Sequence, residues 1–284
     1  MSDSTALVLQ SDFGHADGAV AAMIGVALSH DPQLRIFELS HEIEPYNIWE
    51  ASYRLFQTIG YWPKKTVFVS VVDPGVGTER KSVVVETDTG CYIVTPDNGT
   101  LTHIQHFVGI KAIREIDEGR HLKASAENSY TFYGRDLYAN VGAKLAAGII
   151  DFKEVGPRLK DYLPYCLTLG EVTKTATKIS GCVDILDIRF GSLWTNIPYR
   201  DFQALGVDFG EYIDITIQNG DSLVYNNRMV FAKSFAQVKV GEQMVYINSL
   251  HRVALAINQG SFAKAYSIGT GLQWQISLEV PAKV

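Results

Sequence analysis

The chain has 284 residues, of which 46% are hydrophobic and 20% charged, and its formal net charge is −6. This length is enough for one large domain or two ordinary ones with a sizeable core, and the acidic balance excludes a general electrostatic attraction to nucleic acid or anionic lipid. Acidic residues flank the first short apolar run, and no run of about 18 uncharged apolar residues occurs, so we expect neither a signal peptide nor a membrane span.

Five short runs in the first half are rich in branched apolar residues, which is typical of strands covered on both faces. They are ALVLQ (6–10), RIFEL (35–39), TVFVSVV (66–72), SVVVET (82–87) and CYIVT (91–95). Helix-like segments separate the first three runs, and this βαβ rhythm predicts an α/β domain with a mostly parallel sheet.

The two intervening helices carry recognisable start and stop signals. Asp17 can cap a helix whose apolar positions keep helical spacing from Val20 to Leu28. Asn47, with a glutamate three residues later, resembles a capping box, and Gly60 stands where that second helix would stop.

After about residue 155 the rhythm changes. The stretch 156–170 has two prolines and no clear period, and short strand-like runs follow it. In EYIDITIQNGD, the isoleucines at 213, 215 and 217 alternate with polar residues up to an Asn-Gly turn. We predict a second, all-β domain at residues 168–284, forming a small barrel or sandwich.

The first candidate site is SDFGHADG, where the first strand ends. Ligands of open parallel sheets bind beyond the carboxyl ends of the strands, and Asp12 falls at such an end. The segment has no GxGxxG, and carboxylates repel phosphate but accept hydrogen bonds from a ribose diol, so a nucleoside is favoured over a nucleotide. The alternative is that Asp12 and Asp17 only cap turns and helices.

The second candidate is VVDPGVGTER, which places Asp73 and Arg80 on either side of one tight loop. Its glycines are too few for a P-loop, and the Lys-Ser/Thr ending is missing, so phosphate binding is weakly supported. An arginine partner would lower the aspartate pKa and keep the carboxylate ionised. Taken alone, this segment favours a structural ion pair over a catalytic one.

A third segment, NSYTFYGRDLYAN, surrounds Gly134 with aromatic side chains that include Phe132 and Tyr133, which would permit close approach of a flat or cationic ligand.

His103 and His106 have a spacing that could serve a metal from a helix, but no third ligand is apparent, so no metal site is predicted. The three cysteines are widely spaced without CxxC, which favours reduced thiols and a cytoplasmic protein over a disulfide framework or zinc site.

Five motifs occur in the order found in the S-adenosylmethionine hydroxide adenosyltransferases, relatives of the fluorinases and chlorinases. They are SDFGHADG, VVDPGVGTERKSV, PDNGTLT, SYTFYGRD and RFGSLWTNI. The resemblance implies an N-terminal α/β/α sandwich, which we place at residues 1–160, and a C-terminal β-barrel. It also implies S-adenosylmethionine as substrate with no cofactor or metal, and a homotrimer whose active sites lie between the N-domain of one subunit and the C-domain of its neighbour.

The resemblance assigns most of the nucleoside contacts. Asp12 matches the acid that binds the ribose hydroxyls, which agrees with the diol argument, and Tyr46 matches a ring beside the ribose. Phe190 and Phe235 match residues on the adenine side, where stacking would supply affinity. Asn258 is a weaker match near adenine.

The methionine end of the substrate is assigned in the same way. Asp187 and Ser249 match groups that hold the amino-acid end, and Trp194 matches an aromatic side chain of the same pocket. Without the resemblance, Asp187 would be interpreted only as an exposed acid beside a pair of core aromatic residues.

The nucleophile site departs from the family pattern. The hydrolases of this family are marked by an Asp, Arg, His set, of which Asp73 and Arg80 match the first two. Tyr133 occupies the histidine position, and a tyrosine followed by a glycine there resembles the chlorinases. The two halves of the site therefore indicate different nucleophiles.

Electrostatics favours water. A carboxylate about 4 Å from an incoming halide costs about 4 kcal/mol at an effective dielectric of about 20, roughly a thousandfold in rate. Asp73 can instead stabilise a water whose oxygen becomes positive during attack, and accept its proton late. Tyr133 could line the pocket and hydrogen-bond water, but with an unperturbed pKa of about 10 it cannot replace an imidazole base.

The sequence therefore predicts hydrolysis of S-adenosylmethionine to adenosine and L-methionine by in-line attack at C5′, with Asp73 orienting water, Arg80 holding Asp73, and Tyr133 lining the pocket. Two alternatives stay open at this point. One is a halide-dependent adenosyltransferase that forms 5′-chloro-5′-deoxyadenosine, and the other is a non-catalytic protein that binds S-adenosylmethionine or adenosine.

Overall fold

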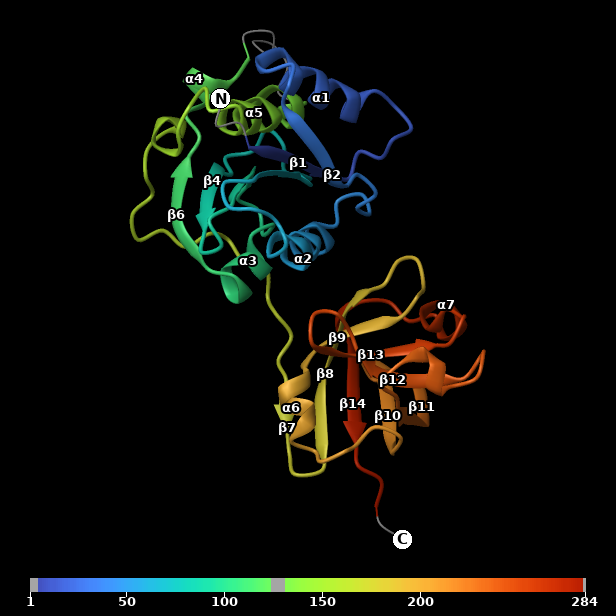
Figure 1. Cartoon of the computed structure of the whole chain (residues 1–284). Helices are drawn as coiled ribbons and strands as arrows, with labels where there is room; N and C mark the ends of the chain where they lie inside the picture. The colour runs from blue at the N-terminus through green and yellow to red at the C-terminus, as the bar shows by residue number, and fades with distance from the viewer. Residues whose placement is uncertain (1–4, 124–130, 283–284) are drawn as a thin grey trace. The chain divides into compact units, whose positions relative to one another are not determined.

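The computed structural model describes residues 5–123 and 131–282. The chain divides into two compact units, Met1–Leu167 and Thr168–Val284, drawn in Figure 1. All three cysteines are free thiols. Over the described ranges, none of the helices combines the length and the apolar character that crossing a bilayer requires.

The first unit alternates strands and helices. Its elements are β1 (Ala6–Ser11), α1 (Ala19–His30), β2 (Arg35–Ser40), α2 (Ile48–Ile59), β3 (Val67–Val71), β4 (Ser82–Thr87), β5 (Tyr92–Pro96), α3 (Thr102–Phe107), β6 (Ile110–Glu115), α4 (Glu118–His121), the π-helical turn η2 (Gly134–Ala139), α5 (Asn140–Ala146) and the 3₁₀ turn η3 (Phe152–Val155). All five predicted strands are present, and β6 is an additional one.

The six strands form one sheet in the order β2-β1-β3-β5-β4-β6. The pairs of β1 with β2, β1 with β3 and β3 with β5 are parallel, whereas β4 runs antiparallel to both of its neighbours. The connection between β4 and β5 is only residues 88–91, which is too short for the crossover that parallel strands need. The mostly parallel sheet is therefore confirmed, with β4 as the exception.

Helices cover both faces of this sheet, which makes the unit an α/β/α sandwich (Figure 1). Along β1, Leu7 and Leu9 pack with α1, α5 and η2, whereas Val8 between them packs with α2 and α3. This alternation follows from the two-residue period of a strand. Both faces are apolar and buried, as the runs of branched residues predict.

The helix starts follow the capping signals in part. The Asp17 carboxylate accepts a hydrogen bond from the Ala19 amide at 2.9 Å, just before α1. The Asn47 side chain accepts from the Glu50 amide at 2.9 Å, which is one half of a capping box. The Glu50 carboxylate instead accepts from the Glu44 amide at 3.1 Å, so α2 is tied to the loop before it.

The second unit is a closed barrel. Its elements are β7 (Thr173–Lys174), β8 (Lys178–Leu186), β9 (Leu193–Pro198), α6 (Tyr199–Gln203), β10 (Tyr212–Asn219), β11 (Ser222–Phe231), the 3₁₀ turn η4 (Phe235–Gln237), β12 (Gln243–Ile247), β13 (Arg252–Ile257), α7 (Phe262–Tyr266) and β14 (Gly271–Glu279). The strand order is β14-β10-β11-β12-β13-β9-β8-β7, and pairing of β14 with β8 closes the ring. A barrel therefore forms, rather than a sandwich.

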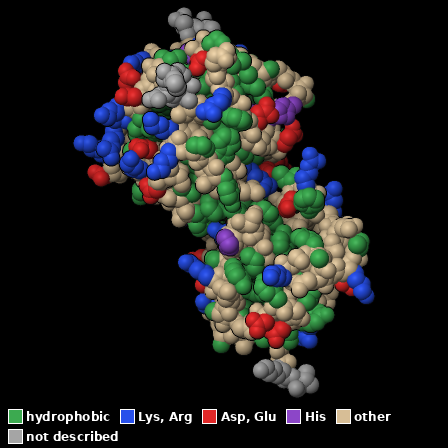
Figure 2. All heavy atoms as spheres, in the orientation of Figure 1, with side chains coloured by type: hydrophobic (Ala, Val, Ile, Leu, Met, Phe, Trp, Pro, Cys, Tyr) green, Lys and Arg blue, Asp and Glu red, His purple; other side chains and the backbone are tan. Residues whose placement is uncertain are grey.

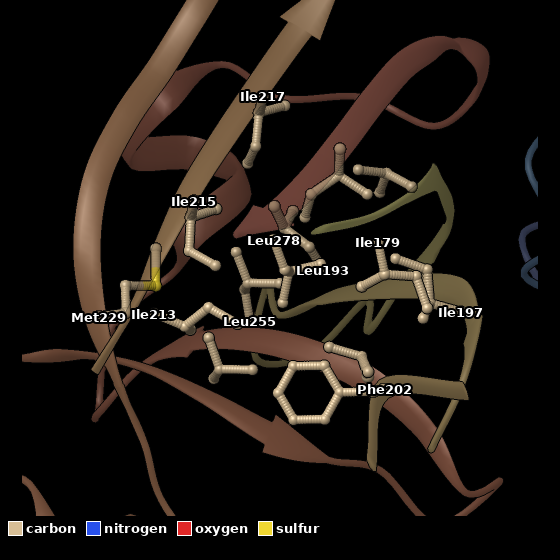
Figure 3. Close-up of a cluster of buried hydrophobic side chains, with 14 of the residues drawn as sticks. Ile179, Leu193, Ile197, Phe202, Ile213, Ile215, Ile217, Met229, Leu255 and Leu278 are labelled. Atoms are coloured by element: carbon tan, nitrogen blue, oxygen red, sulfur yellow. The ribbon is translucent and has the colours of Figure 1, made fainter. Parts of the chain in front are cut away.

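The barrel core consists of side chains that alternate along its strands (Figure 3). Ile213, Ile215 and Ile217 of β10 all point inward and are fully buried, as their spacing predicts. The predicted turn after β10 is also present, because Asn219 pairs with Ser222 and the two-residue loop contains Gly220 at φ +55°.

The surface of the first unit carries charges of both signs. Figure 2 shows Lys and Arg side chains gathered near α4 and β6, with acidic side chains among them. Several of these basic groups are paired, such as Lys111 with Glu86 at 2.7 Å and Lys81 with Glu115 at 2.7 Å. The face in view is therefore mixed rather than uniformly basic.

Candidate active site

Two acidic side chains follow neighbouring parallel strands of the first unit. β1 and β3 are paired in register from Leu7 with Val67 to Ser11 with Val71, so their carboxyl ends lie at one edge of the sheet. Asp12 follows β1 and Asp73 follows β3. The helices that flank β1 cover opposite faces of the sheet, and ligands of such folds bind where the strand order reverses in this way.

A pocket of about 370 Å³ opens at this edge. We call it the Asp12–Asp73 pocket, and its lining comes from four loops of the first unit. The lining residues are Asp12, Phe13, Pro45, Tyr46, Val71, Asp73, Val76, Thr131, Phe132, Tyr133 and Gly134. Six of the predicted site residues are therefore brought together here.

Asp73 and Arg80 form a two-pronged ion pair beside the pocket. Arg80 Nε donates to Asp73 Oδ1 at 2.8 Å, and Arg80 Nη2 donates to Asp73 Oδ2. The Asp73 side chain is only 6% exposed and the Arg80 side chain 10%, so a nearly buried guanidinium holds the carboxylate in one orientation. Burial by itself would lower the pKa of Arg80, but the bond to Asp73 and nearby negative groups raise it overall.

Tyr46 lies across the same pocket in a strained backbone conformation. Its φ is +69°, in the left-handed region that a bulky residue seldom adopts. The Tyr46 amide donates to Asp12 Oδ2 at 2.9 Å, which holds the turn in place, while the Tyr46 ring is 73% exposed. Such strain persists where the surroundings fix it and is concentrated at functional sites.

A buried serine and histidine hold the loop that carries Asp12. Ser11 Oγ and His41 Nδ1 are 2.6 Å apart, and the Phe13 and Gly14 amides bond to Ser11 Oγ and to the His41 carbonyl. Burial lowers the pKa of His41, so the neutral ring is favoured. These residues lie outside the lining but fix its first wall.

Another wall of the Asp12–Asp73 pocket is the aromatic segment 131–134, where η2 begins. The Phe13 and Phe132 rings meet edge to face at 5.7 Å, and a Cβ added at Gly134 would lie 3.0 Å from the Phe13 ring. Glycine at 134 therefore permits this close approach. Tyr133 is nearly buried, and the Arg80 guanidinium lies 5.9 Å from the centre of its ring.

Glu118 is a site residue that the sequence motifs do not contain. The Tyr133 hydroxyl donates to Glu118 Oε2 at 3.2 Å, and Ser82 Oγ donates to Glu118 Oε1 at 3.1 Å. Arg80 Nη1 in turn donates to Ser82 Oγ at 3.4 Å, so a polar chain runs from Asp73 to Tyr133. Glu118 begins a one-turn helix, and its spacing from the motifs carries no chemical signal.

A second pocket of about 690 Å³ lies in the barrel unit. We call it the Phe190–Phe235 pocket. Its lining residues are Asp187, Arg189, Phe190, Ser192, Phe235, Tyr246, Ile257, Asn258, Gln259, Gly260 and Ser261. Phe190 is 71% and Phe235 is 41% exposed, so two aromatic rings are available for stacking.

Local hydrogen bonds shape this second pocket. Asn258 Nδ2 donates to the carbonyls of Phe235 at 3.2 Å and Val238 at 2.8 Å, which fixes the turn that carries the Phe235 ring. Gly191 has φ +67°, and a Cβ there would lie 1.9 Å from Ser261 Oγ. Only glycine therefore allows this approach between the loop after Asp187 and the start of α7.

Trp194 and Ser249 are not among the lining residues of the Phe190–Phe235 pocket. Trp194 lies behind it, because its Nε1 donates to the hydroxyl of the lining residue Tyr246 at 3.1 Å. Ser249 is exposed in the turn between β12 and β13, beyond the pair of Ile247 with Val253. Asn258 follows the opposite end of β13, so this unit does not bring Ser249 and Asn258 together.

The two histidines of α3 have other hydrogen-bond partners. His103 is fully buried against aromatic rings and bonds through Nδ1 to Ser52 Oγ at 2.9 Å, whereas His106 Nδ1 lies 2.8 Å from the Thr102 carbonyl. Within residues 5–123 and 131–282, no group of three or more His, Cys, Asp or Glu side chains could hold a metal ion.

The Asp12–Asp73 pocket has carboxylates beyond the carboxyl ends of parallel strands, and the Phe190–Phe235 pocket has exposed aromatic rings. Each of these features is typical of proteins that bind small molecules. Comparison with protein families gives the particular family. Residues 7–156 match the SAM hydroxide adenosyltransferase N-terminal domain, and residues 181–275 match the C-terminal domain of the same family. The chain belongs to the SAM hydroxide adenosyltransferase family.

Individual relatives cover most of the chain. The (R)-S-adenosyl-L-methionine hydrolase of Methanocaldococcus jannaschii is 36% identical over 239 residues, which are 82% of this chain and 81% of that protein. A fluorinase of Actinopolyspora mzabensis is 28% identical over 98% of this chain and 99% of its own. A crystal structure of an uncharacterized conserved protein from Thermotoga maritima is similar with a TM-score of 0.86, at 33% identity, covering 96% of this chain and 100% of that one.

Proposed function

We propose that the protein hydrolyses S-adenosyl-L-methionine to adenosine and L-methionine. Similarity to hydrolases named for this substrate, at 36% and 30% identity, supports the reaction. The observation that carries the proposal is the Asp73 carboxylate, fixed by two bonds from Arg80 at the edge of the pocket that also contains Asp12.

The reaction is a displacement at the ribose C5′. The oxygen of water forms a bond to C5′ while the C5′–S bond breaks, and its electron pair stays on sulfur as the neutral thioether of methionine. The water oxygen becomes positive during attack, so a carboxylate beside it stabilises the transition state and accepts the proton late. Arg80 holds the Asp73 carboxylate in one orientation through two hydrogen bonds, and no acid is needed for the leaving group.

Two pockets supply the chemistry that this substrate requires. In the Asp12–Asp73 pocket, Asp12 would accept hydrogen bonds from the ribose hydroxyls and Tyr46 would lie against the sugar, with Phe132 and Gly134 shaping the wall near C5′. In the Phe190–Phe235 pocket, Phe190 and Phe235 would stack on adenine near Asn258. Asp187 would bind the amino-acid end of the substrate.

We place the protein in the cytoplasm and propose a homotrimer in which the Asp12–Asp73 pocket of one subunit, within residues 1–160, works with the Phe190–Phe235 pocket of a neighbour, within residues 168–284. Trp194 and Ser249 of that neighbour's barrel would then contribute to binding the methionine end of the substrate.

Light scattering should give three times the chain mass. Mixing the inactive variants Asp73→Asn and Phe190→Ala, followed by subunit exchange, should restore activity, because some sites combine two native halves. Activity that stays absent after verified exchange would contradict shared sites.

The reaction itself is tested by incubating purified protein with S-adenosylmethionine and separating the products by chromatography. Sodium chloride and sodium gluconate are compared at equal ionic strength. We expect adenosine and methionine in both salts. A chloronucleoside in chloride alone would identify a halide-dependent adenosyltransferase, and tight binding without any product would identify a non-catalytic binding protein.

A further inference from the structure

The nucleophile side of the Asp12–Asp73 pocket carries more negative charge than the motif residues account for. Asp73 and Arg80 have opposite formal charges and are joined by two hydrogen bonds, so together they are neutral. Asp73 lines the pocket and Arg80 does not, so Arg80 offsets only part of the repulsion that an isolated Asp73 carboxylate would exert on a halide. The repulsion is therefore weaker than the sequence alone predicts, and a second negative group would strengthen the rejection of halide.

Glu118 supplies that charge. Its two carboxylate oxygens accept from the Tyr133 hydroxyl at 3.2 Å and from Ser82 Oγ at 3.1 Å, and Ser82 is itself bonded by Arg80. Neighbouring basic side chains have other acidic partners, as with Arg120 and Glu154. Among the ion pairs formed within residues 5–123 and 131–282, none joins Glu118 to a Lys or Arg. The group of Asp73, Arg80 and Glu118 thus has a formal charge of −1.

Glu118 also determines whether the hydrogen of the Tyr133 hydroxyl is available to a nucleophile. A halide ion needs donors around it, whereas water both donates and accepts hydrogen bonds. The Tyr133 hydroxyl donates its hydrogen to Glu118 at 3.2 Å, so that hydrogen is not offered to a halide in the pocket.

We propose that Glu118 is a specificity-determining and positioning residue that makes the pocket select water over chloride. It acts through the Tyr133 hydroxyl and through Ser82, and it touches neither substrate nor nucleophile. This inference rests on the proposed hydrolysis.

The test compares the native protein with Glu118→Gln, which keeps the shape of the side chain and removes its charge. Adenosine formation is followed against chloride concentration, with gluconate keeping the ionic strength constant. We expect chloride to inhibit Glu118→Gln at concentrations roughly fiftyfold lower than the native protein, as expected for removing a unit charge about 7 Å from a nucleophile beside Tyr133 at a dielectric of about 20. The KM for S-adenosylmethionine should stay within about twofold, because Glu118 does not bind the substrate.

Two further variants separate charge from structure. Glu86→Gln makes the same change in a surface pair with Lys111 and should leave chloride sensitivity unchanged. Tyr133→Phe keeps the Glu118 charge, so we expect it to be less sensitive to chloride than Glu118→Gln. Thermal unfolding confirms that each variant is folded.

The outcomes distinguish this inference from the proposed function. A native protein that forms no adenosine contradicts the proposed function, and this inference with it. A native protein that forms adenosine, with Glu118→Gln no more sensitive to chloride, contradicts the inference alone. Greater chloride sensitivity confined to Glu118→Gln supports it, and a chloronucleoside formed by that variant supports it further.

Discussion

Replacing Asp73 by asparagine should nearly abolish hydrolysis while the protein stays folded. The amide keeps the size of the side chain but removes the charge and one of the two acceptors that Arg80 uses. Loss of a positioned proton acceptor lowers the rate by about 10²- to 10⁴-fold. Arg80 is only 10% exposed, so leaving its charge without Asp73 should also destabilise the first unit by about 2–4 kcal/mol.

The assay for Asp73→Asn measures adenosine formation, thermal unfolding and adenosine binding by calorimetry. Adenosine binding should stay within about threefold of the native value, because Asp12 and not Asp73 is assigned to the ribose. Asp214→Asn is the matched control, since Asp214 makes the same two-pronged pair with Arg228 on the exposed barrel surface. Hydrolysis by folded Asp73→Asn within threefold of the native rate would refute the role given to Asp73.

Three other changes test parts of the site. Gly134→Ala places a Cβ 3.0 Å from the Phe13 ring, so we expect a higher KM for S-adenosylmethionine, and an unchanged KM would contradict this packing. Gly191→Ala combines φ +67° with a Cβ 1.9 Å from Ser261 Oγ, so adenosine binding should weaken by about tenfold, whereas Gly210→Ala, at φ +94° but in open space, should not affect it. Burial lowers the pKa of His41 in the folded state, so the unfolded state binds more protons below about pH 6.5. The contribution of neutral His41 to the unfolding free energy of the first unit should therefore be complete above that pH and be lost as pH falls through the folded pKa. His41→Gln should reduce this pH dependence in thermal unfolding.

Much of the fold can be predicted from periodicity and turn chemistry. The buried strands β1 and β3 are continuous apolar runs, and the alternating isoleucines of β10 all face the barrel core. β6 is harder to predict because Lys111, Arg114 and Glu115 break its pattern. As an edge strand covered by residues 157–159, it can carry charge where central strands cannot.

Only part of the site can be predicted from the sequence. Motifs identify residues that lie near one another along the chain, but not residues that the fold brings together from distant segments. Asp12, Asp73 and Tyr133 converge because β1 and β3 are parallel neighbours and the segment before η2 reaches the same edge. Glu118 and the pair of Ser11 with His41 act through contacts across 15 and 30 residues of sequence, and their spacing has no chemical meaning until the chain is folded. Ser249 lies beyond the lining of the barrel pocket, so its assignment depends on the resemblance.

The central claim is that water is the nucleophile at C5′, and the most direct measurement is the reaction in ¹⁸O-labelled water. Mass spectrometry of the products, with fragmentation to separate base from sugar, locates the label. We predict one ¹⁸O atom in the ribose of adenosine and none in methionine. Adenosine without ¹⁸O in its sugar, or a nucleoside carrying chloride in place of the 5′-hydroxyl, would contradict it.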